Sequence, residues 1–315
     1  MKIELFDKCT LTVGDMDFSP IEALGNVTFH DIVPPQDLAK TIGDADIALV
    51  NKAVLTEEVF TRCPNLKYVG IFATGYNNID LEAAKRHGIT VCNVPGYSTD
   101  SVTQHVFALL LQIAGSIGQY DKSVHNGDWV KSLAFSYFPY PIIEIRDKTF
   151  GIFGFGSIGK AVAKVADAFD MKVIICTRTK PENCPYELVS KEELFAHSDF
   201  LTIHSPLTPQ TKELVNKDTL ALMKPTAVLI NTARGGVVNE QDLADALNDG
   251  KIAAAGLDVL TVEPMKADNP LLKAKNCVIT PHTAWASKEA RQRLIGMVAG
   301  NIKAFMDEKP INVVS

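Results

Sequence analysis

Three side chains with complementary acid–base chemistry follow three successive apolar runs of the chain. Arg234 comes just after the first run, Glu263 after the next and His282 after the last. An arginine can bind a carboxylate through two parallel hydrogen bonds. A histidine exchanges a proton near neutral pH, and a neighbouring carboxylate can fix its tautomer and favour its protonated form. Singly, each is more often a surface salt-bridge partner or a structural residue; together they predict a site that binds an organic acid and transfers a proton.

A glycine-rich turn lies upstream, where an apolar run leads directly into a helical pattern. Gly154 permits a tight turn, Gly156 lets the backbone approach a pyrophosphate, and Gly159 allows close packing of helix on strand. The N–H groups at Ser157 and Ile158 then open a helix whose N-terminus attracts phosphate. The turn therefore predicts dinucleotide binding, with an ordinary βαβ turn as the alternative.

The elements that must position these residues alternate between strand and helix, which predicts parallel sheets. In the first hundred residues the expected strands are Lys2–Phe6, Val27–His30, Ile47–Val50, Tyr68–Phe72 and Thr90–Asn93. Between residues 149 and 280 we expect six more strands, the count of a complete dinucleotide-binding fold. Ligands of such sheets bind at the carboxyl ends of the strands, where the three reactive side chains lie.

We therefore predict an α/β protein with two domains, each a parallel sheet flanked by helices. A flavodoxin-like substrate-binding domain comprises residues 1–99 with 287–315, because the final helix, at about 288–306, is expected to return to it. A Rossmann-type nucleotide-binding domain comprises residues 100–286.

Composition and charge limit the kinds of molecule that this protein is expected to bind. Hydrophobic residues make up 46% of the 315 and charged residues 22%, which is typical of a globular enzyme. A net charge of −6 argues against nucleic acid, and no apolar run reaches the length of a membrane span. The start of the chain lacks a signal-peptide pattern, and the six scattered cysteines indicate reduced thiols and no metal site. We expect a cytoplasmic protein that binds neither metal, membrane nor nucleic acid.

Two apolar segments predict a partner subunit. A long helix near Thr99–Ser116 and an aromatic loop near Phe135–Tyr140 carry more hydrophobic surface than a monomer usually exposes. We expect a homodimer, with local packing of the loop on its own domain as the alternative.

Several motifs resemble the signatures of the D-isomer-specific 2-hydroxyacid dehydrogenases, and the resemblance runs over essentially the whole chain. They are Gly154–Gly159, Asn231–Gly236, Gly256–Pro264 and Pro281–Ala284, joined by Gly75–Asp80 and His204–Pro209. Asn51-Lys52, Val94–Thr99 and Val124–Trp129 further resemble the glycerate dehydrogenase/hydroxypyruvate reductase branch.

The resemblance implies a role for each matching residue. Arg234 would hold the substrate carboxylate and carbonyl, His282 would protonate the carbonyl oxygen as hydride arrives, and Glu263 would orient His282. Substrate would also be bound at Lys52, Ala73, Thr74 and Gly75. Asp258 would meet the nicotinamide amide, and His282 would also border the cofactor. The cofactor would further be lined by Thr103, Pro206, Thr232 and Ala233.

The residues expected at the adenosine ribose depart from the NAD pattern. An acid should follow the second strand, but Thr177, Arg178, Thr179 and Lys180 stand there. Hydroxyls and cations would receive a 2′-phosphate, so the cofactor is NAD(P)(H) with NADP(H) favoured. The alternative is an NAD(H) enzyme in which Arg178 stacks on adenine or faces solvent.

The expected activity is D-stereospecific hydride transfer between the cofactor and a small 2-oxo or 2-hydroxy acid, with hydroxypyruvate and glyoxylate as the expected substrates. The alternative is a corepressor-like, nucleotide-sensing binding protein, because those proteins keep the same three residues. The lack of long interaction tails argues against it. Glu263 argues against formate dehydrogenase, where a glutamine pairs with the histidine.

Overall fold

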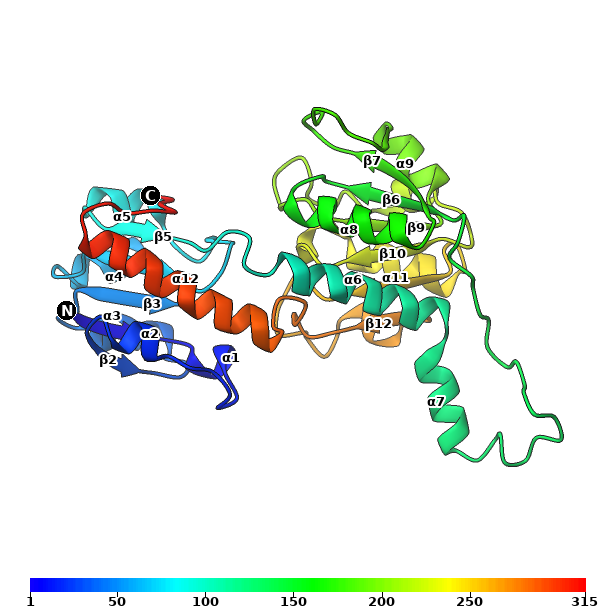
Figure 1. The fold of residues 1–315 in the computed structure, drawn as a ribbon, viewed down its shortest axis with the longest axis horizontal. Helices are drawn as coiled ribbons and strands as arrows, with labels where there is room; N and C mark the ends of the chain where they lie inside the picture. The colour runs from blue at the N-terminus through cyan, green and yellow to red at the C-terminus, as the bar shows by residue number, and fades with distance from the viewer. The chain divides into compact units, whose positions relative to one another are not determined.

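The computed structural model describes all of residues 1–315, and the chain divides into two compact units (Figure 1). Unit 1 contains Met1–Ser98 and Trp285–Ser315, and unit 2 contains Thr99–Ala284. Each unit is an α/β body with one parallel sheet.

The sheet of unit 1 has five parallel strands in the order β2-β1-β3-β4-β5. They are β1 (Lys2–Leu5), β2 (Asn26–Phe29), β3 (Ile47–Val50), β4 (Tyr68–Ile71) and β5 (Thr90–Cys92). This is the flavodoxin-like order, so the prediction for this fold is confirmed. Successive residues of β3 alternate between two apolar cores, with Ile47 and Leu49 on one face and Ala48 and Val50 on the other.

Helices supply both cores of unit 1. They are α1 (Lys8–Leu11), α2 (Ser19–Glu22), η1 (Pro35–Asp37), α3 (Leu38–Ile42), α4 (Glu57–Arg62), α5 (Leu81–Arg86) and α12 (Lys288–Met306). Ser287 caps α12 by accepting a hydrogen bond from the N–H of Ala290. The buried face of α12, including Leu294 and Val298, packs with α2 and β4.

The sheet of unit 2 has seven parallel strands in the order β12-β11-β10-β9-β6-β7-β8. They are β6 (Thr149–Phe153), β7 (Lys172–Cys176), β8 (Glu187–Leu188), β9 (Phe200–Ile203), β10 (Val228–Asn231), β11 (Ala254–Leu257) and β12 (Cys277–Ile279). Read from β6, this is the Rossmann order with one further strand. The expected count of six was wrong, because the edge strand β8 has two exposed residues and no apolar run.

Helices of unit 2 cover the sheet and carry one projecting segment. They are α6 (Thr99–Ala114), α7 (Ile117–His125), α8 (Ser157–Ala168), α9 (Lys191–His197), α10 (Lys217–Leu220), η2 (Gly235–Val237), α11 (Glu240–Asn248) and η3 (Pro270–Lys273). No single helix is long and apolar enough to cross a membrane; α6 and α7 reach the criterion only as a pair bent by 57°.

The apolar face of α6 is not the exposed surface that the sequence suggested. Its residues Val106, Leu109 and Leu110 are buried in the same core as Phe150 of β6, so this part of the prediction was wrong. On α6 only Leu111 is an exposed large apolar residue, and most of those in this region come later, on α7 and the segment that returns to β6. They include Ile117, Trp129, Val130, Leu133, Phe135, Phe138 and Ile142. In Figure 1 this segment extends away from the sheet of unit 2.

Candidate active site

The sequence-predicted residues of unit 2 gather at one edge of its sheet. The strands β6, β9, β10, β11 and β12 lie side by side and run parallel, so their carboxyl ends share this edge. Gly154 follows β6, Ser205 and Pro206 follow β9, Thr232–Arg234 follow β10, Asp258 follows β11 and His282 lies beyond β12.

The carboxylate of Glu263 and the imidazole of His282 form a direct pair. Nδ1 of His282 lies 2.6 Å from Oε2 of Glu263, and a carboxylate can only accept, so Nδ1 carries the proton of this bond. The other oxygen of Glu263 accepts a hydrogen bond from the N–H of Leu260 at 2.9 Å. Both side chains remain about one-third exposed, at 29% and 35%. Nε2 of His282 is therefore the nitrogen left to face a substrate oxygen.

A buried carboxylate holds the turn that presents His282. The side chain of Asp258 is wholly buried and accepts hydrogen bonds from the hydroxyl of Thr280 at 2.6 Å and the N–H groups of Thr283 and Ala284 at 2.9 and 2.8 Å. His282 itself has φ +54°, in the left-handed region that costs free energy for a residue with a Cβ. The turn is thus fixed by bonds that outweigh local strain.

Asp258, which the family resemblance places at the nicotinamide amide, is held here by protein groups. Both oxygens of Asp258 are engaged by residues 280–284, so the side chain acts here on the turn of His282. His105 of α6 joins the same group: its Nε2 lies 2.8 Å from the Thr280 hydroxyl and 3.5 Å from Asp258. Nothing in the helical spacing of α6 marks His105 for this position.

Arg234 lies in a loop packed directly against the segment that carries Glu263. The loop is closed by Asn231, whose side chain accepts from the N–H of Ala233 and donates to the carbonyl of Arg234 at 3.0 and 2.9 Å. A Cβ on Gly235 would collide with the backbone of Leu260, so only glycine allows this approach. The guanidinium is half-buried and donates to the carbonyl of Ala233 at 2.7 Å.

The glycine turn after β6 fits a pyrophosphate. Gly154 has φ +95°, and a Cβ there would lie 2.7 Å from the carbonyl oxygen of His204. A Cβ on Gly159 would collide with the carbonyl of Gly154, whereas a Cβ on Gly156 would meet no protein atom within 4 Å. The side facing Gly156 is therefore open, and α8 begins there without a side-chain cap or an acidic residue in its first turn. Such a helix N-terminus suits a phosphate.

Two buried hydroxyls beside this turn have no protein partner. Oγ of Ser205 and Oγ1 of Thr232 follow the neighbouring strands β9 and β10, and neither makes a hydrogen bond. A buried hydroxyl without a partner is unfavourable, so both fit a ligand that supplies one. Thr232 was predicted from the sequence and Ser205 was missed; only its position beside Pro206 at a strand end could have pointed to it.

The other predicted cofactor residues differ in their burial and in their hydrogen bonds. Thr103 is buried and its hydroxyl donates to the carbonyl of Thr99 at 2.8 Å, while the carbonyl of Pro206 accepts from the Thr211 hydroxyl at 2.6 Å. After β7, Thr177 is half-buried, and Arg178, Thr179 and Lys180 are exposed.

His204 lies in the same strand-end region and is kept uncharged. Nε2 of its ring lies 3.0 Å from the hydroxyl of Thr202, a buried residue. Burial lowers the pKa of His204 to about 3. His204 is therefore uncharged near neutral pH.

The predicted substrate residues of unit 1 lie on two adjacent strand-end loops. Lys52 follows β3, and Ala73, Thr74 and Gly75 follow β4. The second loop is tied to the end of β5: the Thr74 hydroxyl donates to the carbonyl of Val94 at 2.8 Å, and the side chain of Asn93 donates to the carbonyl of Thr74 at 2.7 Å.

Comparisons with known proteins show the family to which the chain is similar. Residues 107–284 match the family model described as the NAD binding domain of D-isomer specific 2-hydroxyacid dehydrogenases. The chain is 45% identical, over an alignment 323 positions long, to the hydroxypyruvate reductase of Blautia hydrogenotrophica, with 100% of each chain covered. It is 43% identical over 282 residues to the glycerate dehydrogenase of Methylorubrum extorquens, covering 89% of this chain and 88% of that one.

A solved structure is similar over the same length. It is an acyclic imino acid reductase in complex with NADPH and D-Arg, with 35% identity, a TM-score of 0.88 and 100% of both chains covered. The present chain belongs to the D-isomer specific 2-hydroxyacid dehydrogenase family. It is an NAD(P)-dependent oxidoreductase.

Proposed function

We propose that the protein reduces hydroxypyruvate or glyoxylate to the D-configured 2-hydroxy acid. The observation that carries this proposal is the 2.6 Å pair of Glu263 and His282 at the strand ends of a dinucleotide-binding sheet. The relatives named hydroxypyruvate reductase and glycerate dehydrogenase support the choice of substrate.

The reaction divides between a reductant and an acid. A dinucleotide held at the glycine turn after β6 would supply hydride to the carbonyl carbon. Nε2–H of His282 gives its proton to the carbonyl oxygen, and the carboxylate of Glu263 stabilises the imidazolium before that transfer. Arg234 holds the substrate carboxylate and polarises the carbonyl with its planar guanidinium. Water then restores the proton on His282.

We propose that residues 1–99 with 287–315 bind the substrate and residues 100–286 bind the dinucleotide. Lys52 and the backbone of Ala73, Thr74 and Gly75 would then contact the substrate carboxylate. Support comes from their position on neighbouring strand ends, after β3 and β4. In the dinucleotide-binding part, Gly154, Gly156, Ser157, Ile158 and Gly159 would receive the pyrophosphate. Thr103, Pro206, Thr232, Ala233, Asp258 and His282 would line the remaining cofactor.

NADP(H) is the proposed preferred cofactor. Thr177, Arg178 and Thr179 would receive the 2′-phosphate, and the three residues present no carboxylate to repel it. The NADPH held by the similar imino acid reductase is consistent with this choice.

A homodimer is proposed from the projecting segment of unit 2. Val130, Leu133 and Phe135 are at least 89% exposed, and residues of this size are rarely left in water together. A second copy would cover them.

A cytoplasmic location is proposed as well. The six free cysteines, two of them buried, fit the reducing cytoplasm.

Cofactor absorbance tests the proposal at neutral pH, with hydroxypyruvate, glyoxylate and pyruvate assayed in parallel with NADH and NADPH. We expect turnover with the first two acids and faster reaction with NADPH. A parallel arm adds an amine, because a rate that depends on the amine would mark imine reduction. Tight cofactor binding without turnover of any acid would instead indicate a nucleotide sensor and refute the proposal.

A further inference from the structure

A buried aspartate of unit 1 binds three consecutive backbone N–H groups. Oδ2 of Asp7 accepts hydrogen bonds from the N–H groups of Asn51, Lys52 and Ala53 at 3.0, 2.7 and 2.8 Å. Asp7 is only 3% exposed. The three donors belong to the loop that leaves β3 and carries Lys52.

The local backbone explains why this carboxylate is there. Beyond Val50 the chain leaves the sheet, so its N–H groups lose their ladder partners and need acceptors. Successive N–H groups in a turn form a concavity that binds anions. Asp7 fills it from the end of the neighbouring strand β1, and its φ of +61° lies in the left-handed region that aspartate, asparagine and glycine tolerate best.

Further contacts extend this clamp to both substrate loops. The hydroxyl of Thr10 donates to the carbonyl of Asp7 and accepts from the side chain of Asn51, both at 2.7 Å. On the other side, Asn78 donates to the carbonyl of Ala53 at 2.8 Å. Asn78 belongs to the Gly75–Asp80 motif, so the two loops are joined.

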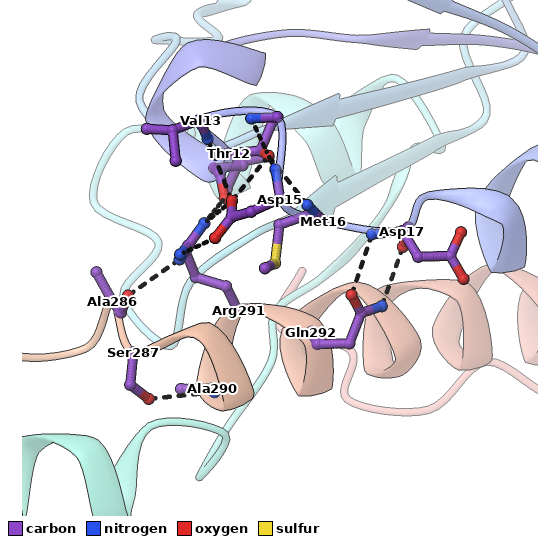
Figure 2. A network of polar contacts seen from close by, with 12 residues as sticks. Thr12, Val13, Asp15, Met16, Asp17, Ala286, Ser287, Ala290, Arg291 and Gln292 are labelled. Carbon is purple, nitrogen blue, oxygen red and sulfur yellow. Dashed lines mark hydrogen bonds and ion pairs between the residues drawn. The ribbon is translucent and has the colours of Figure 1, made fainter.

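The short segment that carries Asp7 is itself anchored at its far end. Arg291 of α12 forms a bidentate pair with Asp15, with both N–O distances 2.8 Å, and donates to the carbonyl of Leu11 at 3.1 Å (Figure 2). The side chain of Gln292 exchanges two hydrogen bonds with the backbone of Asp17. Residues 7–17 are therefore fixed by Asp7 at one end and by α12 at the other.

We propose that Asp7 is a positioning residue for substrate binding: its carboxylate holds the loop of residues 51–53 so that Lys52 presents its ammonium to the substrate carboxylate. This inference rests on the proposed function, because Lys52 is a substrate residue only if the substrate is a small anion. Asp7 itself touches neither the substrate nor the cofactor.

Two substitutions distinguish the effect of the Asp7 carboxylate from the effect of its left-handed backbone conformation. Asp7→Gly keeps the left-handed conformation and removes the acceptor, and Asp7→Asn keeps one oxygen and removes the charge. Asp147→Gly is the matched control, because Asp147 has the same φ of +61° and an exposed side chain in unit 2.

The first measurement is amide hydrogen exchange of residues 51–53, which does not depend on activity. We expect faster exchange there in Asp7→Gly, an intermediate rate in Asp7→Asn and no change in Asp147→Gly. Exchange that is unchanged in Asp7→Gly would overturn the proposal.

The second measurement is steady-state kinetics with hydroxypyruvate at saturating NADPH. Asp7→Gly should raise KM for the acid by up to about tenfold, no more than loss of the Lys52 ammonium, and leave cofactor affinity unchanged, because a displaced binding group weakens substrate binding. In a Lys52→Met background the same substitution should change KM less than about twofold, as expected when both act through one contact. A full effect in that background would mean that Asp7 acts only on stability and would overturn the proposal. If the parent protein is inactive on every 2-oxo acid, the proposed function is refuted. The hydrogen-exchange result is separate from that outcome, because it does not depend on activity.

Discussion

At the strand ends of both parallel sheets a buried carboxylate holds a neighbouring loop, but the two loops present different chemical groups. Asp258 of unit 2 and Asp7 of unit 1 are both buried, and each accepts hydrogen bonds from the backbone of a neighbouring loop. In unit 2 the held turn presents His282 beside Glu263, and two buried hydroxyls nearby remain without partners. In unit 1 the held loop presents Lys52 and backbone.

This difference teaches that a parallel sheet supplies a place for a site, and the strand-end residues supply the chemistry. A carboxylate that satisfies loop N–H groups is a structural solution available to any such sheet. Protonation of a carbonyl oxygen suits an imidazole that keeps one nitrogen for the substrate, and the turn after β12 presents such an imidazole at the same sheet edge as the glycine turn of unit 2. This contrast supports the proposal that unit 2 carries the reacting groups and that unit 1 contributes to substrate binding.

The largest expected effect comes from removing the acid. His282→Ala should lower kcat about 10²–10⁴-fold, the usual range for a lost general acid, with KM nearly unchanged. Lys52→Met in unit 1 should instead raise KM for the acid roughly tenfold. Steady-state kinetics of both variants tests this prediction, with the exposed His197→Ala as control. The contrast between the two units would be contradicted if His282→Ala and Lys52→Met changed kcat and KM in the same way.

Next in size is the loss of the planar guanidinium. Arg234→Lys should lower kcat/KM about a hundredfold, because an ammonium cannot contact carboxylate and carbonyl oxygen as one fork. Titration of NADPH fluorescence should show unchanged cofactor affinity, as for the exposed control Arg146→Lys. An equal loss of cofactor affinity would place Arg234 in the nucleotide site.

A smaller effect is expected at the ribose loop. Arg178→Ala should weaken NADPH roughly ten- to a hundredfold and spare NADH, since a charged contact to a phosphate contributes about 1.5–3 kcal/mol. Thr177→Asp should tilt preference toward NADH. The two dissociation constants must be compared at one salt concentration. A parent that already prefers NADH, with a ratio unaltered by Arg178→Ala, would contradict our interpretation of this loop.

The last prediction concerns folding stability, not activity, and involves the neutral histidine of unit 2. Burial holds the pKa of His204 near 3, below its ordinary value of 6.5, so the unfolded chain takes up a proton in this window and the folded chain does not. The stabilisation is complete above pH 6.5 and declines by roughly 1.4 kcal/mol per pH unit toward pH 3. His204→Gln should flatten that decline in urea unfolding measured across the window; a parallel decline in the variant would show that His204 titrates normally.

Much of this fold was predictable because its signals are local. The apolar runs that end at Val50, Phe153 and Asn231 determine buried strands, and the spacing of Gly154, Gly156 and Gly159 determines the turn between β6 and α8. The edge strand β8 lacks such a run and was missed.

The residues that hold the reactive groups in place were harder to predict from the sequence. The roles of Asp7 and His105 depend on contacts with residues more than 40 positions away in the sequence, which no periodicity reports. The apolar face of α6 was misassigned because a helical pattern does not tell whether its own core or a partner covers it. Likewise, the sequence marks Asp258 as a strand-end acid, and only the structure shows that its oxygens bind the turn of His282.

The central claim is that Glu263 stabilises the protonated form of His282 for transfer to the substrate. The most direct test compares kcat for hydroxypyruvate in the parent and Glu263→Gln at one pH, with the exposed Glu187→Gln as control. Glutamine can still accept the bond from Nδ1–H but carries no charge to stabilise the imidazolium, so kcat should fall in Glu263→Gln and stay unchanged in Glu187→Gln. An unchanged kcat in Glu263→Gln would contradict the claim.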